Sequence, residues 1–106
     1  YPSQIAINSN AHALARYSAL VQECGMVPIV EPEVLMDGTH TIESSFEVTD
    51  KTLNTVFGQL AKHHVDLKGI VLKPNMVLSG YNCDNQASVQ EVAQKTSTNL
   101  GLYAKK

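Results

Sequence analysis

The sequence contains no tryptophan and only two cysteines, Cys24 and Cys83, which stand far apart and without CxxC spacing. A disulfide framework is therefore not expected. No apolar run approaches the roughly 18 residues of a membrane helix, and no signal peptide opens the sequence. Eight basic residues stand against ten acidic ones, for a net charge of −2, so the chain lacks a positive field that would gather nucleic acid or an acidic membrane surface. We expect neither kind of partner.

The composition is typical of a protein that packs a core. Hydrophobic residues make up 43% of the chain and charged residues 17%, which excludes the disordered and collagen-like classes. However, 106 residues are far fewer than the roughly 250 of a closed (β/α)8 barrel. Because the chain begins at Tyr1 and helical periodicity starts almost at once, we expect it to be a segment of a longer protein.

Two short apolar runs are predicted to be strands of a parallel sheet. The runs at residues 26–31 and 70–73 lack polar alternation, as do strands that are covered on both faces. Pro32 and Pro74 end them. The long connection between the runs suits a right-handed crossover through a helix. Because two parallel strands alone would leave both edges unpaired, we expect further strands outside this sequence.

Three helices are expected around these strands. Apolar residues at helical spacing over residues 3–24 predict the first helix, and Gly25 suits a left-handed C-terminal cap. Ser44 and Ser88 each stand three positions before a glutamate, the capping-box spacing that predicts the starts of the second and third helices. The expected inner faces are Leu53, Val56, Phe57, Leu60 and Ala61 for the second helix, and Val89, Val92, Ala93, Thr96, Leu100 and Tyr103 for the third.

Each predicted strand ends in one ionisable residue directly before proline: Glu31 before Pro32, and Lys73 before Pro74. Proline keeps the preceding residue extended and removes the next backbone donor, so each ionisable residue is fixed at the carboxyl end of its strand. Ligands bind at that end in α/β barrels and open sheets. We therefore expect Glu31 and Lys73 to lie side by side at a ligand-binding edge.

This pair has the chemistry to form an imine with a ketone. A lysine at the rim of an apolar strand is partly desolvated, which favours the neutral, nucleophilic amine. A carboxylate on the neighbouring strand, Glu31, can deliver the proton that the departing hydroxyl needs. Glu33 is expected to support Glu31, because it would share its face if the extended backbone continued and would favour its protonated form. From spacing alone, a structural ion pair between Glu31 and Lys73 and a solvent-facing Glu33 are the alternatives.

The histidines are predicted to have structural roles. His63 and His64 suit the negative end of a helix dipole, and the residues around them lack the spacing of a metal cage. His12 and His40 are expected to be isolated surface residues. No GxGxxG or GxxxxGK[ST] loop predicts a nucleotide site. The strand-end pair is therefore the best candidate for chemistry.

Two segments resemble adjacent barrel-strand motifs of class I fructose-bisphosphate aldolase, in the order and at the separation found in that family. They are VPIVEPE at residues 27–33 and LKPNMV at residues 72–77. The LARY run at residues 14–17 and the HHV run at residues 63–65 are also similar to the family. The resemblance covers nearly all of the chain and weakens after Asp84.

The resemblance implies that residues 1–106 are an internal segment of a single α/β domain, a (β/α)8 TIM barrel, with no internal domain boundary. It makes Lys73 the catalytic residue that forms the Schiff base and Glu31 the catalytic acid/base. The implied reaction of the full-length protein is the cleavage of fructose 1,6-bisphosphate to dihydroxyacetone phosphate and glyceraldehyde 3-phosphate in glycolysis, and the reverse condensation. No cofactor or metal is implied, because the protonated imine is itself the electron sink. The segment alone is expected to be inactive, since it lacks the family's residues on earlier and later strands.

The resemblance further implies a small sugar phosphate as the partner, a homotetramer, and a cytoplasmic location, with a plastid or other organelle as the alternative. Two other functions stay open. One is that of another Schiff-base barrel enzyme, such as transaldolase or deoxyribose-phosphate aldolase, against which the VPIVEPE segment argues. The other is a catalytically silent, aldolase-like scaffold, against which the intact Glu31 and Lys73 weigh.

Overall fold

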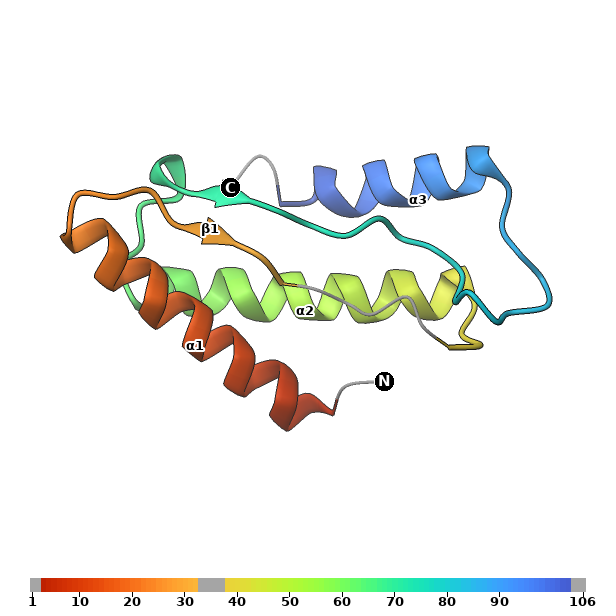
Figure 1. Ribbon diagram of the computed structural model, residues 1–106, viewed down its shortest axis with the longest axis horizontal. Helices are drawn as coiled ribbons and strands as arrows, with labels where there is room; N and C mark the ends of the chain where they lie inside the picture. Colours follow the sequence, from red (N-terminus) through yellow and green to blue (C-terminus); the bar gives the residue numbers. More distant parts are fainter. Residues whose placement is uncertain (1–2, 33–37, 104–106) are drawn as a thin grey trace. The chain divides into compact units, whose positions relative to one another are not determined.

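Residues 3–32 and 38–103 are described by a computed structural model, and they form three α-helices, one 3-10 helix and two strands (Figure 1). In chain order the elements are α1 (Gln4–Glu23), β1 (Ile29–Val30), α2 (Ile42–Lys62), η1 (Leu67–Gly69), β2 (Val71–Leu72) and α3 (Val89–Gly101). These elements belong to two compact units. The first unit takes in the described residues up to Pro32 together with Thr52–Pro74. The second takes in residues 38–51 and those from Asn75 onward, so that α2 contributes residues to both.

The first unit contains a two-stranded parallel sheet. Ile29 pairs with Val71 in parallel register, which confirms the predicted parallel strands. Each strand is only two residues long, shorter than the sequence predicted, and Glu31 and Lys73 lie just beyond the strand ends. The strands are short because each has a single neighbour within the described chain, so only the residues that bridge to that neighbour are paired.

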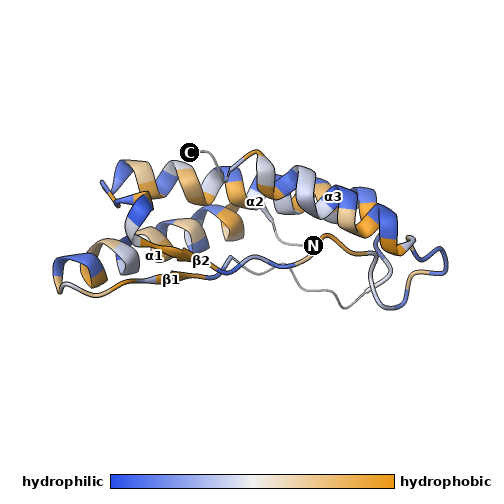
Figure 2. Cartoon of the chain, turned by 90° about the horizontal axis from the view of Figure 1, so that it is seen from above, coloured by the Kyte–Doolittle hydropathy of each residue, from blue (hydrophilic) through white to orange (hydrophobic). Residues whose placement is uncertain are grey.

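Within the first unit, the described helices cover one face of this sheet. Val30 is fully buried and Leu72 half-buried on the covered face, whereas Ile29 and Val71 are 53% and 51% exposed. The expectation of strands covered on both faces is therefore wrong for this chain, although both strands are hydrophobic along their length (Figure 2). The reason is that no described element of the first unit covers the second face, and an apolar run does not reveal which segment buries it.

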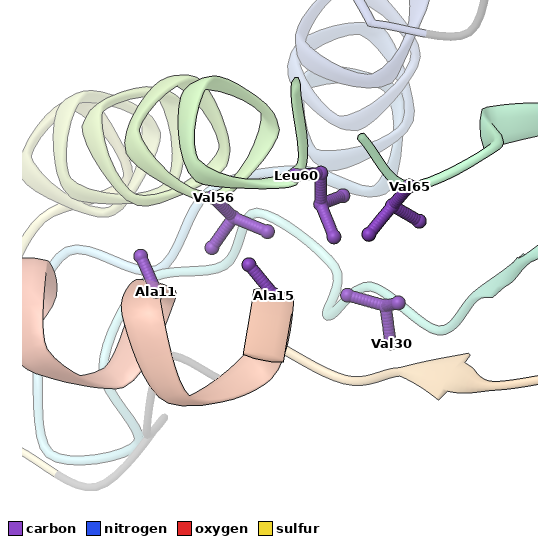
Figure 3. Packing of buried hydrophobic residues seen from close by; sticks show 6 residues of the cluster. All are labelled: Ala11, Ala15, Val30, Val56, Leu60 and Val65. Carbon is purple, nitrogen blue, oxygen red and sulfur yellow. The ribbon is translucent and has the colours of Figure 1, made fainter. Parts of the chain in front are cut away.

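The covered face packs into the hydrophobic core of the first unit, which Figure 3 shows. Ala11 and Ala15, one turn apart on α1, point toward Val56 of α2. Their small side chains let the two helices approach closely. The other members of the cluster are Val30, Leu60 and Val65. This core holds β1 against the helices and so fixes the position of the residue that follows Val30.

Local signals set the helix ends in the first unit. Ser3 caps α1, because its Oγ accepts a hydrogen bond from the backbone N–H of Ala6 at 3.1 Å. Gly25 has a φ of +76°, the left-handed conformation predicted for the C-terminal cap. His64, just beyond α2, has a φ of +56°, a conformation in which histidine is enriched among non-glycine residues. Both helices therefore stop where the sequence predicted.

The start of α2, in the second unit, differs from the prediction. The capping-box spacing placed the start at Ser44, but the helix begins at Ile42. Thr41 is the capping residue, since its Oγ1 accepts a hydrogen bond from the backbone N–H of Ser44 at 3.2 Å. The earlier start puts Ile42 in the first turn, where its side chain is 3% exposed. Burial of that side chain favours Thr41 over Ser44 as the cap.

The third helix starts as predicted but buries only part of the predicted face. Ser88 caps α3 by accepting a hydrogen bond from the backbone N–H of Glu91 at 3.2 Å. Tyr103 is buried as expected, and so is Asn99, which was not predicted on the inner face. Val89, expected on that face, is 83% exposed. The apolar side chains at the start of α3 instead border an open groove of about 440 Å³. That part of the predicted face is uncovered because no described segment of the second unit packs over it.

Hydrogen bonds tie the end of α3 to the first turns of α2. Tyr103 Oη donates to Asp50 Oδ1 at 2.7 Å and also lies 3.0 Å from the Asp50 carbonyl oxygen. Asn99 Nδ2 donates to the carbonyl oxygen of Phe46 at 3.3 Å. Burial, followed by the hydrogen bond and the negative charge of Asp50, raises the pKa of Tyr103 above its ordinary value of 10.0. The folded second unit thus favours the neutral phenol.

Candidate active site

Glu31 and Lys73 lie side by side at the carboxyl ends of β1 and β2. The register pairs Val30 with Leu72, so the next residue of each strand stands opposite the other. The backbone N–H of Lys73 donates to the carbonyl oxygen of Val30 at 2.8 Å, which continues the pairing one step past the strand ends. The structure thus brings the two candidate residues together as expected. Their roles in chemistry stay predictions.

The two side chains share the uncovered face of the sheet. Side chains alternate along a strand, so Glu31 lies on the same face as Ile29, and Lys73 on the same face as Val71. Lys73 Nζ is 3.1 Å from Glu31 Oε1, the distance of a charge-assisted hydrogen bond. The ion pair that the sequence left as an alternative is therefore present. It does not exclude catalysis, because proton exchange between the two groups needs the same proximity.

Water reaches both members of the pair. The Lys73 side chain is 66% exposed and the Glu31 side chain 47% exposed. The expectation that Lys73 is partly desolvated is therefore wrong for this chain, for the same reason that Ile29 and Val71 are exposed. An ion pair this open to water contributes only about 0–1 kcal/mol to stability. The ion pair thus adds little to the stability of the fold. Both side chains are accessible to a ligand.

Gln22 helps to position β2, and sequence reasoning missed it. Its side-chain amide donates to the Asp66 carbonyl oxygen at 2.9 Å and accepts from the Asp66 N–H at 3.0 Å. Asp66 in turn accepts a hydrogen bond from the N–H of Lys68 at 3.0 Å and caps η1. These bonds hold the segment that leads into β2 against the end of α1. No periodicity or motif marks Gln22, because its partner lies 44 residues along the chain.

The remaining candidate residues are Glu33 and the histidines. Glu33 lies outside the described residues, so its supporting role stays a prediction. The expectation that His12 is isolated is wrong, because its ring lies against that of His63. His40 is half-buried rather than a surface residue, since it lies beside Gly80 where two loops of the second unit meet.

Residues 3–32 and 38–103 contain neither a metal cluster of three or more ligands nor a helix suited to a membrane. No group of three or more histidine, cysteine, aspartate or glutamate residues in these ranges has an arrangement that could hold a metal ion. None of the helices in the same ranges is both long and apolar enough to cross a membrane. The strand-end pair of Glu31 and Lys73 is therefore the candidate active site.

The parallel strands, their covering helices and the amine–carboxylate pair at the strand ends define a segment of an α/β barrel. Residues 1–102 match the family model for fructose-bisphosphate aldolase class-I. The chain belongs to this family. Among solved structures it is similar to fructose-bisphosphate aldolase from Plasmodium falciparum in complex with TRAP and a small-molecule inhibitor. The TM-score is 0.92 at 44% identity, over 94% of this chain and 29% of that one.

Curated relatives agree with this assignment. The chain is 58% identical, over 90% of its length, to a probable fructose-bisphosphate aldolase class 1 of Xanthomonas campestris. It is 54% identical, over 93% of its length, to fructose-bisphosphate aldolase of Dictyostelium discoideum, and 50% identical over the same share to human fructose-bisphosphate aldolase B. The chain spans only 27–28% of the length of these relatives.

Proposed function

We propose that this chain supplies two catalytic residues of a class I fructose-bisphosphate aldolase, a lyase, and that activity belongs to a full-length protein that contains it. The reaction is the reversible cleavage of fructose 1,6-bisphosphate to dihydroxyacetone phosphate and glyceraldehyde 3-phosphate. The observation that carries the proposal is the 3.1 Å approach of Lys73 Nζ and Glu31 Oε1 at the carboxyl ends of two parallel strands. In α/β barrels that edge is where substrates bind.

In the proposed mechanism Lys73 is the nucleophile. Its neutral amine attacks the keto carbon of the substrate, forming a carbinolamine. Glu31 then gives a proton to the departing hydroxyl, which leaves as water, and a protonated imine forms on Lys73. Glu31, again a carboxylate, takes the proton of the hydroxyl on carbon 4. The bond between carbons 3 and 4 breaks to release glyceraldehyde 3-phosphate, and its electrons flow into the imine to give an enamine, so no metal is needed as an electron sink. Protonation and hydrolysis of the resulting enamine release dihydroxyacetone phosphate.

The geometry supports this division of roles. The carboxylate within hydrogen-bond distance of Lys73 can take a proton from the ammonium group and pass it to the departing hydroxyl. Both side chains are on the open face of the sheet, so a ketone can reach the Lys73 amine. In the full barrel, the elements that cover this face would also exclude water from the pair, which would favour the neutral amine. The segment alone, with its lysine open to water, is expected to be inactive.

Three further properties belong to the proposal. The substrate class is a small sugar phosphate, the assembly is a homotetramer, and the location is the cytoplasm, with a plastid or other organelle as the alternative. The first is supported by the names of the relatives, and the other two by the family resemblance alone. Light scattering on the purified full-length protein would test the assembly, and a mass other than that of four subunits would contradict it.

The test of the proposal separates chemistry from stability. In the full-length protein, Lys73→Met should abolish cleavage of fructose 1,6-bisphosphate, because methionine keeps the apolar stem and removes the amine. Glu31→Gln should lower the turnover rate by about 10²-fold or more, the usual contribution of a positioned acid/base. Since the ion pair is exposed, the unfolding free energy of each variant should lie within about 1 kcal/mol of that of the parent.

Lys68→Met is the matched control, because Lys68 is exposed on η1 and has no role in the proposed chemistry. It should keep the parent's activity. Parent-like cleavage by Lys73→Met would refute the proposed mechanism. Loss of activity only together with large loss of stability would instead indicate that the pair is a structural ion pair.

A further inference from the structure

Two histidines from distant parts of the chain meet in the first unit. His12 lies in α1, and His63 follows directly after α2. Their ring centroids are 5.0 Å apart, and the ring planes are inclined at 77°. His12 is exposed and His63 half-buried, so the pair is at the surface and open to a ligand from solvent. Neither ring has a part in the chemistry proposed for Lys73 and Glu31.

A hydrogen bond fixes which nitrogen of His63 is available. Nδ1 of His63 lies 2.9 Å from the carbonyl oxygen of Gln59. A carbonyl oxygen only accepts hydrogen bonds, so Nδ1 carries the hydrogen, and in the neutral ring Nε2 keeps its lone pair. Histidines that ligate metals almost always donate their other ring N–H to a carboxylate, a backbone carbonyl or water. His63 already has this arrangement.

The separation of the rings suits a shared metal ion. With zinc–nitrogen distances of about 2.0–2.1 Å and a tetrahedral angle, the centroids of two ligating imidazoles lie roughly 5 Å apart. The observed 5.0 Å matches this separation. Because His12 is exposed, its ring can turn about its side-chain bonds to aim a nitrogen at the ion.

We propose that His12 and His63 form a two-histidine binding site for a divalent transition metal ion of the class that prefers imidazole, such as Zn²⁺ or Cu²⁺. Water completes the coordination shell, since the described residues offer no third ligand in a suitable arrangement. Such a site is open and exchangeable rather than a closed structural site. Because one ligand is in α1 and the other follows α2, the bound ion links these helices and stabilises the folded first unit by mass action.

The site uses neither residue of the proposed catalytic pair. His63 precedes η1 and β2, whereas Lys73 follows β2. A bound metal therefore does not replace the imine chemistry, and the two proposals can fail independently. Substitution of His12 should leave cleavage of fructose 1,6-bisphosphate unchanged while it removes metal binding.

The test compares the full-length protein with its His12→Asn and His64→Asn variants, by Zn²⁺ titration calorimetry and by electron paramagnetic resonance of bound Cu²⁺. His64 is the matched control, because it adjoins His63 and its left-handed backbone suits asparagine. Removing a group that only orients a metal ligand lowers the metal affinity by about 10–100-fold. Because His12 is itself a proposed ligand, His12→Asn should lower the affinity at least tenfold. His64→Asn should bind like the parent.

The spectrum gives a second, independent readout. The parent should show one Cu²⁺ site with two nitrogen ligands that is absent from both His12→Asn and His63→Asn. Affinity should fall as the pH is lowered, because a metal binds the unprotonated imidazole nitrogen. Equal binding by the parent and His12→Asn, or binding lost only in His64→Asn, would overturn the proposal. Loss of metal binding in His12→Asn, with an unchanged circular dichroism spectrum, would support the proposal.

Discussion

Substitution of Gly80 by alanine should separate two loops of the second unit. A Cβ added at Gly80 would overlap the carbonyl oxygen of Gly38, and would lie 2.7 Å from its carbonyl carbon and 2.9 Å from His40 Nδ1. Real Cβ atoms essentially never approach other atoms this closely, and two of these neighbours are backbone atoms that cannot turn away. The loops at residues 38–40 and 79–82 must therefore move apart.

The magnitude follows from the contacts that hold the loops together. The N–H of Gly80 donates to the carbonyl oxygen of His40, and that of Asn82 to the carbonyl oxygen of Gly38, each at 2.8 Å. A hydrogen bond contributes about 0.5–1.5 kcal/mol net, and overpacking typically costs about 1–3 kcal/mol. We expect Gly80→Ala to lower the unfolding free energy by about 2–3 kcal/mol. The assay is urea unfolding of the full-length protein, followed by circular dichroism.

Gly58→Ala provides the matched control, since the same chemical change is made where there is space. Gly58 is exposed within α2, and no atom lies within 4 Å of an added Cβ. Alanine in a helix interior is about 0.5–1 kcal/mol more stable than glycine, so this variant should unfold at a higher urea concentration than the parent. A Gly80→Ala variant as stable as the parent would refute the close approach of the two loops.

Two further predictions concern hydrogen bonds that the sequence did not reveal. Gln22→Ala should destabilise the protein by about 1–2 kcal/mol, because it removes both bonds to the Asp66 backbone. Hydrogen exchange of the Asp66 amide should quicken, and unchanged exchange would contradict the role of Gln22. Tyr103→Phe should lower the unfolding free energy by about 1–2 kcal/mol near neutral pH, because the hydrogen bond to Asp50 is lost. Because the pKa of Tyr103 is raised above 10.0, its contribution is present below pH 10.0 and is lost as the pH rises further. Above pH 10.0, unfolding midpoints should thus fall less steeply with pH in the variant than in the parent, and equal slopes would argue against the raised pKa.

Local signals allowed most of the elements to be predicted. Two apolar runs that end in proline indicated the strands, and glycine or serine at the ends of helical periodicity indicated α1 and α3. These signals act within a few residues of the chain, so they are visible in one sequence. The start of α2 was misplaced because Thr41 and Ser44 both offer a capping hydroxyl. Burial of Ile42, a tertiary effect, decided between them.

Long-range contacts could not be predicted in the same way. The meeting of Glu31 and Lys73 was predictable because parallel strands bring their carboxyl ends to one edge of a sheet. The contacts of Gln22 with Asp66 and of His12 with His63 follow no such rule, because they depend on how particular helix surfaces pack. Similarly, the exposure of Lys73 depends on segments that cover the open face of the sheet. None of these features has a local pattern.

Trapping the imine on Lys73 tests the proposed mechanism directly. Full-length protein is mixed with dihydroxyacetone phosphate, reduced with borohydride so that the imine becomes a stable secondary amine, digested, and mapped by mass spectrometry. The proposed mechanism predicts a single adduct on the peptide that contains Lys73, and none in the Lys73→Met variant. Absence of any adduct, or an adduct on a different lysine such as Lys68, would contradict it.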